Sequence, residues 1–276
     1  MKNHGGYILE YDKNDDLNLS FLVLSGKREN LVQLLNKGPK TLQEIKDSLN
    51  VTSSGIIPEI RKLEEKRLIQ QKEREYSLTE IGEVVAESIS RVERNIHVFN
   101  RDLKFWNEHR IEGIPKEFRL RLYELGNYEI IRSTTTDILR PQNEYLKILL
   151  KAKKFKGVSS VLHPQYPKYV IDLADNGVPV SLIVTRKLFK VINENFGEYL
   201  KRGINYDNAN IFIYDENIKF SFSVTDFFLS LRLFLKDGTY DFYQNIISFD
   251  RSAVKWGEDL FGYYEVRSKK VRSEDL

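Results

Sequence analysis

One helical segment limits the possible architectures of this chain more than any other feature. From Thr79 the sequence predicts a helix of about 30 residues, whereas helices in globular domains average about 11–12 residues. Its apolar positions recur at intervals of 4, 4, 3, 4, 3, 4 and 3 residues, which is the spacing of a coiled-coil seam. They are Ile81, Val85, Ile89, Val92, Ile96, Phe99, Leu103 and Trp106. Because a length of 276 residues favours two domains over one, we expect this helix to link two domains.

The narrow apolar stripe of this helix has two interpretations. It can pack on its own domain, as the apolar face of an amphipathic helix usually does. Charged residues such as Glu87 and Arg94 flank the stripe, and this favours a partner helix and hence a homodimer. His97 and His109 are expected on the helix surface, because no second metal-ligating residue follows either of them by four positions. The predicted dimerisation residues are Val85, Ile89, Val92, Ile96, Phe99, Leu103 and Trp106.

Three short helices are predicted before the long one. The first covers residues 25–36 and ends at a Gly-Pro pair. Thr41 and Glu44 have the spacing of a capping box, which opens the second helix. A tight turn at residues 50–51 precedes the third helix, and residues 52–54 offer N-cap oxygens to it. This order of helices predicts a helix-turn-helix.

Residues 70–78 change from helical to alternating periodicity and are too polar for a central strand. They predict a short hairpin, or wing. A helical bundle without nucleic acid is the other interpretation of the same elements. In the stretch from Arg61 to Arg74, six basic side chains stand against three acidic ones. This stripe fits local DNA contact, although a solvated helix with internal ion pairs has a similar composition.

The net charge of +3 argues against a non-specific nucleic-acid binder, because that role needs a concentrated excess of cations. The basic stripe instead predicts contacts at defined positions of the third helix and the wing. Pro58 is expected to bend the start of the third helix. The predicted DNA-contacting residues are Thr52, Ser53, Ser54, Gly55, Arg61, Lys62, Lys72 and Arg74.

The sequence of residues 61–69 followed by residues 76–82 contains a Lys-Leu-Glu motif, a Leu-Ile pair and then Leu-Thr-x-x-Gly. It resembles the winged helix-turn-helix of archaeal and bacterial regulators. The resemblance implies that the third helix enters the major groove of double-stranded DNA and that the wing contacts the backbone. A two-fold dimer of such a protein would select a pseudo-palindromic operator.

Beyond the break at residues 112–115, strands and helices alternate. The predicted strands are 128–131, 157–162, 178–184, 210–214, 219–224 and 228–235, and the predicted helices are 141–152, 167–175, 186–201 and 248–262. The middle of this region predicts a parallel βαβ unit, and strands from 210 onward are expected to be antiparallel. The expected fold class is therefore α+β or α/β, with a winged helix-turn-helix, a long linker helix and an α/β domain with a mixed sheet.

These patterns divide the chain into five expected parts. Residues 1–20 are a flexible leader, 21–79 the winged helix-turn-helix, 80–111 the linker and dimerisation helix, 112–266 the α/β effector domain, and 267–276 a polar, frayed tail. The chain has no Cys, which suits a reducing compartment. It also has no apolar run near the roughly 18 residues of a membrane span. We expect a cytoplasmic protein without a membrane partner.

His163 lies at the carboxyl end of a predicted parallel strand, where α/β sheets usually bind ligands. Thr185 and Arg186 hold the same position on the next strand, and Tyr166 follows His163. These four residues predict a pocket for an anionic small molecule, with Arg186 as its charge partner. The alternative is that His163 and Pro164 only terminate a strand while Arg186 lies at the start of a surface helix.

The chain lacks a glycine-rich phosphate loop, a serine elbow, paired catalytic carboxylates and a metal-ligand motif. We therefore expect no enzymatic activity, no cofactor and no metal. The stretches 156–164, 176–180 and 184–186 resemble the C-terminal domain of methanogen filament-formation regulators. This resemblance implies a regulator with an effector that it does not name. Together with the winged helix and the seam of the long helix, it leads us to expect a sequence-specific, dimeric DNA-binding transcriptional regulator with an effector-binding C-terminal domain. The alternative is an α/β nucleotide- or small-molecule-binding protein, or an enzyme, whose winged helix serves protein interaction.

Overall fold

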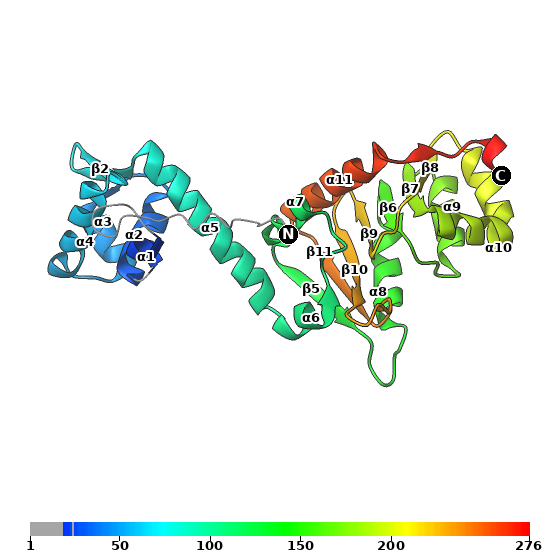
Figure 1. Cartoon of the computed structure of the whole chain (residues 1–276), viewed down its shortest axis with the longest axis horizontal. Helices are drawn as coiled ribbons and strands as arrows, with labels where there is room; N and C mark the ends of the chain where they lie inside the picture. The colour runs from blue at the N-terminus through cyan, green and yellow to red at the C-terminus, as the bar shows by residue number, and fades with distance from the viewer. Residues whose placement is uncertain (1–18, 24) are drawn as a thin grey trace, which may run out of the picture. The chain divides into compact units, whose positions relative to one another are not determined.

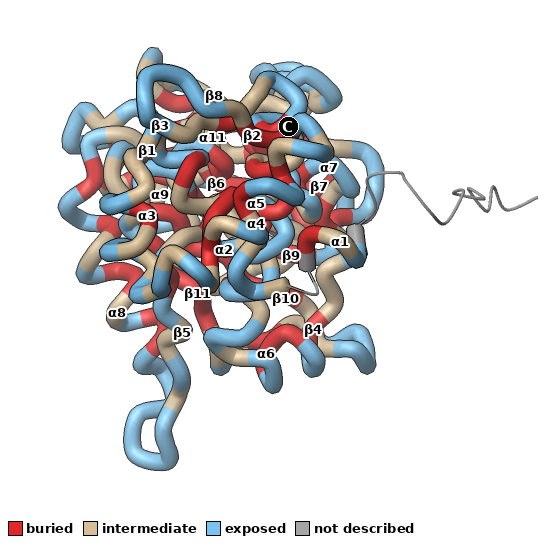
Figure 2. Tube along the Cα trace, turned by 90° about the vertical axis from the view of Figure 1, so that its left-hand side faces the viewer, coloured by how far each residue is buried: buried red, intermediate tan, exposed pale blue. Residues whose placement is uncertain are grey.

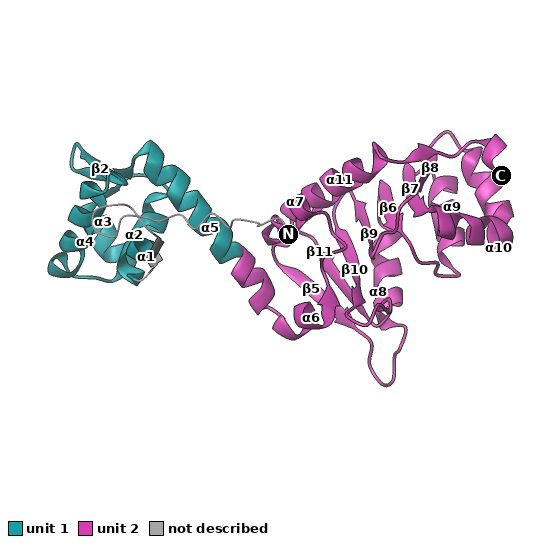
Figure 3. Ribbon diagram, viewed as in Figure 1, with its two compact units in different colours: residues 1–94 teal, residues 95–276 magenta. Residues whose placement is uncertain are grey.

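The computed structural model describes residues 19–23 and 25–276. The chain divides at Arg94, within helix α5 (Glu80–Asn100), into two compact units (Figures 1 and 3). Most of the expected leader, residues 1–20, lies outside the described residues; Leu19 and Ser20 begin helix α1 (Leu19–Val23). Every helix in the described part of the chain is too short or too polar to cross a lipid bilayer.

The first unit is a winged helix-turn-helix, as predicted. Its helices are α2 (Gly26–Leu35), α3 (Leu42–Leu49) and α4 (Ser53–Glu65), and its strands are β1 (Lys40–Thr41), β2 (Ile69–Lys72) and β3 (Glu75–Leu78). The strands form an antiparallel sheet of order β1-β3-β2. Leu31, Ile45, Ile56 and Leu63 are fully buried between the three helices. The apolar residues whose spacing predicted these helices thus form the core of this unit.

Local hydrogen bonds fix the ends of these helices. The Thr41 hydroxyl accepts from the Glu44 N–H at 3.3 Å, and the Glu44 carboxylate accepts from the Thr41 N–H at 2.7 Å, which confirms the capping box. Asn50 ends α3 in a left-handed conformation with φ of 50°, which Asn tolerates better than most residues. The tight turn between α3 and α4 therefore follows from residues within the turn.

The Leu-Thr-x-x-Gly motif at the end of the wing has a packing explanation. The Thr79 hydroxyl donates to the Arg67 carbonyl at 2.6 Å and accepts from the Gly82 N–H at 3.1 Å. A Cβ atom on Gly82 would lie 1.9 Å from the Leu68 carbonyl oxygen. Only glycine allows the first turn of α5 to approach the turn between α4 and β2 this closely.

The predicted single helix from Thr79 to Arg110 is wrong in its length. Helix α5 ends at Asn100, and Asp102 caps a separate helix, α6 (Leu103–Glu108), through a 2.9 Å bond from the Phe105 N–H to its carboxylate. The break turns Phe105 and Trp106 into the core of the second unit. There the Trp106 indole donates to the Tyr128 hydroxyl at 2.9 Å. Burial of two aromatic side chains outweighs continuation of the helix.

The second unit contains a nine-stranded mixed sheet, which confirms the predicted fold class. Its order is β12-β8-β7-β6-β9-β10-β11-β5, and β4 pairs with β10 beside this path. Strands β6, β7 and β8 are parallel, and the remaining pairs are antiparallel. The strands are β4 (His109–Arg110), β5 (Tyr128–Arg132), β6 (Phe155–Ser159), β7 (Val180–Thr185), β8 (Ala209–Tyr214), β9 (Phe220–Thr225), β10 (Leu229–Leu235), β11 (Gln244–Ser248) and β12 (Lys269–Lys270).

Helices cover both faces of this sheet (Figure 1). Trp256 and Phe261 of α11 (Arg251–Glu265) pack with Phe222 and Leu231 on one face. The other face is covered by α8 (Arg140–Leu149), α9 (Tyr166–Asp175) and α10 (Arg186–Ile204). The short helices α7 (Lys116–Arg119), η1 (Leu122–Leu125) and η2 (Ser273–Asp275) complete the unit. Figure 2 shows the resulting burial along the chain.

Three expectations for this unit need correction. Strand β8 was expected to be antiparallel to its neighbours but pairs with β7 in parallel, because helix α10 returns the chain to the same end of the sheet. Strand β11 was not predicted. The tail is not frayed: β12 pairs with β8, Val271 is buried, and its N–H donates to the Ile211 carbonyl at 2.8 Å.

Candidate nucleic-acid interface and ligand pocket

The exposed side of α4 carries the predicted base-contacting residues. Ser54 and Arg61 are exposed, and Arg61 has no ion pair with any described residue. Lys62 is also exposed but pairs with Glu59 at 3.0 Å, so part of its charge is neutralised. Helix α4 continues through Pro58. Arg61 is therefore the unneutralised cation on the middle of this helix.

The first turn of α4 contains the hydrogen bonds that cap this helix. The Thr52 hydroxyl accepts from the Gly55 N–H at 3.3 Å and lies 3.1 Å from the Ser54 hydroxyl oxygen. Ser53 is half-buried. Thr52 therefore caps the helix, and Ser54 is the exposed serine of this turn.

The tip of the wing has an unusual backbone. Strands β2 and β3 pair in register from Lys72 and Glu75, so that only Glu73 and Arg74 form the turn. Both have positive φ, 49° and 70°, as a two-residue hairpin of the primed type requires. Glycine or asparagine normally fills such positions. The wing thus holds the exposed cations Lys72 and Arg74 at its tip despite backbone strain.

The predicted dimerisation seam is not one continuous exposed stripe. Ile89 and Trp106 are each 7% exposed, in the cores of the first and second units, and Val85 and Phe99 pack against those same cores. Val92, Ile96 and Leu103 remain 59%, 52% and 54% exposed. The expectation of a seven-residue seam is corrected because four of its members are used within the chain. On α5 the exposed apolar residues are Ile81, Val84, Val92 and Ile96.

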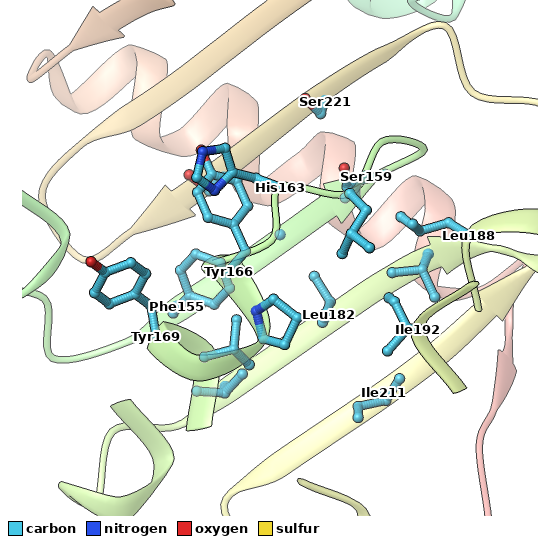
Figure 4. Close-up of a pocket in the computed structure, with 18 of the residues that line it drawn as sticks. Phe155, Ser159, His163, Tyr166, Tyr169, Leu182, Leu188, Ile192, Ile211 and Ser221 are labelled. Atoms are coloured by element: carbon cyan, nitrogen blue, oxygen red, sulfur yellow. The ribbon is translucent and has the colours of Figure 1, made fainter. Parts of the chain in front are cut away.

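The second unit contains a cavity of about 120 Å³ between the sheet and helices α8, α9 and α10 (Figure 4). His163 and Tyr166 line it, with their ring centroids 4.7 Å apart. Thr185 and Arg186 do not line it. Thr185 caps α10 by accepting from the Leu188 N–H at 3.3 Å, and the exposed Arg186 pairs with Asp215 at 2.5 Å. The expectation that Arg186 is the charge partner of a ligand is therefore corrected.

The charged residue in the cavity wall is Arg232, which was not predicted. It lies on β10, is 5% exposed, and is the only Arg, Lys, Asp or Glu among the residues that line the cavity. Its Nη2 atom has no hydrogen-bond partner within the described structure. The sequence does contain a signal, since Arg232 interrupts the apolar run Leu229–Leu235 of a buried strand.

Hydroxyl groups surround this guanidinium. The Tyr145 and Ser223 hydroxyl oxygens lie 3.0 Å apart, and Tyr240 is hydrogen-bonded to Ser221. Burial raises the pKa of Tyr240 to about 12 and also raises the pKa of Tyr145 and Tyr166. Burial, together with the positive charge of Arg232, lowers the pKa of His163. At neutral pH the tyrosines are therefore protonated donors and His163 is uncharged.

The fold and these surfaces define the class of the protein: a winged helix-turn-helix protein that carries an α/β domain with a mixed sheet. Residues 138–267 match the middle domain of the Methanogenesis regulatory protein FilR1, and residues 16–101 match the HVO_A0261 N-terminal domain. The resemblance to methanogen filament-formation regulators is thereby confirmed.

In the described residues, no group of three or more His, Cys, Asp or Glu residues is arranged to hold a metal ion.

Comparisons with individual proteins gave three further similarities. The Methanogenesis regulatory protein FilR1 of Methanothrix harundinacea (strain 6Ac) is 26% identical over 254 residues, which are 90% of this chain and 56% of that protein. The chain thus spans about half the length of this relative. The archaeal chromatin protein TrmBL2 is 16% identical, over 92% of this chain and 94% of its own, with a TM-score of 0.42. NucT from Helicobacter pylori is 11% identical, over 52% and 99%, with a TM-score of 0.41.

Proposed function

We propose that this protein is a sequence-specific DNA-binding transcription regulator whose second unit binds an effector. The observation that carries the proposal is the unneutralised basic surface of the winged helix, with Arg61 on α4 and Lys72 and Arg74 on the wing. Winged helices place the third helix in the major groove and the wing on the adjacent backbone. The similarity to a protein named as a methanogenesis regulator supports a regulatory role.

The residues of this surface have separate tasks in the proposal. Arg61 and Ser54 contact base edges, because they are exposed polar side chains about two turns apart on one face of α4. Lys72 and Arg74 contact phosphates and add affinity without sequence preference. The Gly55 N–H is already bonded to Thr52, so the N–H groups of Ser53 and Ser54 at the start of α4 are the ones that can approach a phosphate. Thr52 and Lys62 support the helix rather than contact bases, since Thr52 already caps α4 and Lys62 already pairs with Glu59.

A homodimer is the second part of the proposal. Val92 and Ile96 lie exposed on α5 together with Ile81 and Val84, and exposed apolar side chains on one helix favour a partner helix. A two-fold dimer would bind two half-sites and so a pseudo-palindromic operator.

The proposal is tested by selecting DNA fragments on the full-length protein and measuring their binding by fluorescence anisotropy over a range of salt concentrations. We expect Arg61→Ala to weaken binding to the selected fragment by about 1–3 kcal/mol and to relax the preference at one base position. Arg251→Ala is the matched control, because Arg251 is an exposed arginine of the second unit, and it should bind normally.

Equal binding to all sequences would contradict the proposal, as would unchanged binding by Arg61→Ala. Absence of binding to every fragment would favour the alternative in which the winged helix serves protein interaction.

A further inference from the structure

The guanidinium of Arg232 is buried in the cavity wall of the second unit without a carboxylate beside it. Arg232 is 5% exposed, its Nη2 has no hydrogen-bond partner in the described part of the chain, and no Asp or Glu lines the cavity. Arginine stays protonated in proteins, and a buried charge is unfavourable unless an opposite charge or several hydrogen bonds compensate it. Tyr240 is hydrogen-bonded to Arg232, but no opposite charge in the cavity wall balances the guanidinium, so the site favours an anion.

The sheet around Arg232 has the pattern of a binding surface rather than of a core. On β9 and β10, Phe220, Phe222, Leu229, Leu231 and Leu233 face the apolar cluster that contains helix α11. The alternate residues Ser221, Ser223, Ser230 and Arg232 line the cavity. Ser221 pairs directly with Arg232 in the antiparallel register, and Ser223 pairs with Ser230. Apolar residues would fill these positions if packing alone were required.

The groups near Arg232 fit one negative charge. Arg232 influences the ionisation of Tyr145, His163, Tyr166 and Tyr240 through its charge, so all four lie within electrostatic range of it. The tyrosines supply neutral hydroxyl donors, and His163 is uncharged at neutral pH. A carboxylate matches this set, because it carries one charge and accepts two parallel bonds from a guanidinium. A phosphate carries more charge, and the cavity wall offers no second Arg or Lys.

The rest of the cavity is apolar. Leu182, Leu188, Ile192 and Ile211 line the part away from His163 and Tyr166 (Figure 4). The volume of about 120 Å³ is slightly smaller than an engineered cavity of about 150 Å³ that binds benzene. The space therefore fits a single ring or a short branched chain.

We propose that this cavity binds a small monocarboxylate with an aromatic or branched aliphatic body, whose carboxylate pairs with Arg232. The hydroxyl groups of Tyr240 and Tyr166 orient the carboxylate, and the body lies between Leu182 and Ile211. The proposal rests on the effector-binding role proposed for the second unit and gives that effector a chemical class.

The first test is calorimetric titration of the full-length protein, with a thermal shift as a second readout. The probes are benzoate, phenylacetate and isovalerate. Benzyl alcohol serves as a ring without charge, and inorganic phosphate as a charge without an apolar body. We expect saturable binding and a raised Tm with at least one carboxylate and with neither control compound. The proposal is overturned if no carboxylate binds, or if a control compound binds as tightly.

The second test compares two arginines. Arg232→Met should weaken carboxylate binding at least about 30-fold, the usual loss when one member of a buried charge pair is removed. The Tm of the unliganded variant should stay the same or rise, because a buried charge without a counter-ion has been removed. Arg186→Met, which removes an exposed arginine paired with Asp215, should bind as the wild type does.

A purely structural role for Arg232 predicts the opposite pattern, a lower Tm with carboxylate binding retained, and this would overturn the proposal. If Arg232→Met fails to fold, Arg232→Lys takes its place. It keeps the charge but loses the bidentate geometry, so carboxylate affinity should fall about tenfold or more. Undiminished affinity in Arg232→Lys would count against the pairing.

These results are separable from the test of the proposed function, because carboxylate binding is measured without DNA. Carboxylate binding that leaves DNA affinity unchanged would support the site and contradict its effector role. Carboxylate binding in Arg61→Ala should equal that of the wild type, since Arg61 belongs to the other unit.

Discussion

At the scale of single residues, the most informative side chain outside the two candidate sites is His109. It was expected on a helix surface but is 3% exposed. Its Nδ1 lies 2.7 Å from the Phe105 carbonyl oxygen and its Nε2 lies 2.9 Å from the Asp241 carboxylate. Both partners are oxygen atoms that can accept hydrogen bonds, so the ring is held between a backbone carbonyl and a buried carboxylate. It stacks on Phe105 with centroids 4.0 Å apart.

This pair leads to a prediction about acid stability. Burial disfavours ionisation of Asp241, but hydrogen bonds from His109, the Tyr243 N–H and Gln244 outweigh it and hold the pKa of Asp241 below its usual value. A lowered pKa contributes stability above the unfolded-state pKa of about 3.9, and this contribution is lost as pH falls through the folded-state value. Asp241→Asn should therefore cost about 3 kcal/mol at neutral pH, because it removes the buried negative charge that accepts from His109, Gln244 and the Tyr243 N–H.

Urea unfolding followed by circular dichroism, at neutral and at acidic pH, measures this effect. The gap between wild type and Asp241→Asn should narrow in acid, and the exposed control Asp207→Asn should match the wild type throughout. A gap that widens as pH falls would show that the carboxylate does not have the assigned role.

At the scale of elements, the turn of the wing carries charged residues where glycine would be more stable. Glu73 and Arg74 hold positive φ in a two-residue turn, a conformation that costs a residue with a side chain about 1 kcal/mol relative to glycine. Arg74 is exposed and pairs with no described carboxylate, so it makes no ion pair that would stabilise the fold. A strained arginine at this position is consistent with contact to DNA.

Arg74→Gly should therefore raise the free energy of unfolding by about 0.5–1 kcal/mol. It should also weaken DNA binding and reduce the salt dependence of the DNA-binding constant by the amount expected for about one phosphate contact. Guanidinium unfolding and anisotropy at several salt concentrations measure the two effects. Glu73→Gly is the matched control, since it relieves similar strain but removes an acidic side chain. It should gain stability without losing affinity, and a parallel loss of affinity in both variants would assign the effect to turn geometry.

At the scale of the whole molecule, the exposed part of α5 determines whether two chains associate. The seam predicted from periodicity is partly used within each unit, which leaves Val92 and Ile96 exposed on α5. We expect Val92→Asp to convert a dimer into a folded monomer, because a charge in an apolar helix pair is strongly unfavourable. Light scattering after gel filtration measures the mass. Val191→Asp, at a half-exposed valine of α10 in the second unit, should stay dimeric.

If the wild type is a monomer, or if Val92→Asp keeps its mass, the exposed face of α5 has another role.

The sequence by itself determined the winged helix-turn-helix nearly to the residue. The signals at Thr41, Glu44 and Asn50 act over three or four neighbours, and the turn and helix ends they specify are found in the structure. The alternating strands of the second unit were mostly predicted for the same reason. Strand β11 was missed because its short polar start gives little local signal.

Only the tertiary structure decided which arginine faces the cavity. The sequence pattern predicted Arg186, but strand pairing buries Arg232 opposite Ser221 and leaves Arg186 exposed beside Asp215. The same holds for His109, whose partner Asp241 is distant in the chain. Caps and turns are local interactions, whereas the burial and pairing of a charge depend on segments that meet only when the sheet forms.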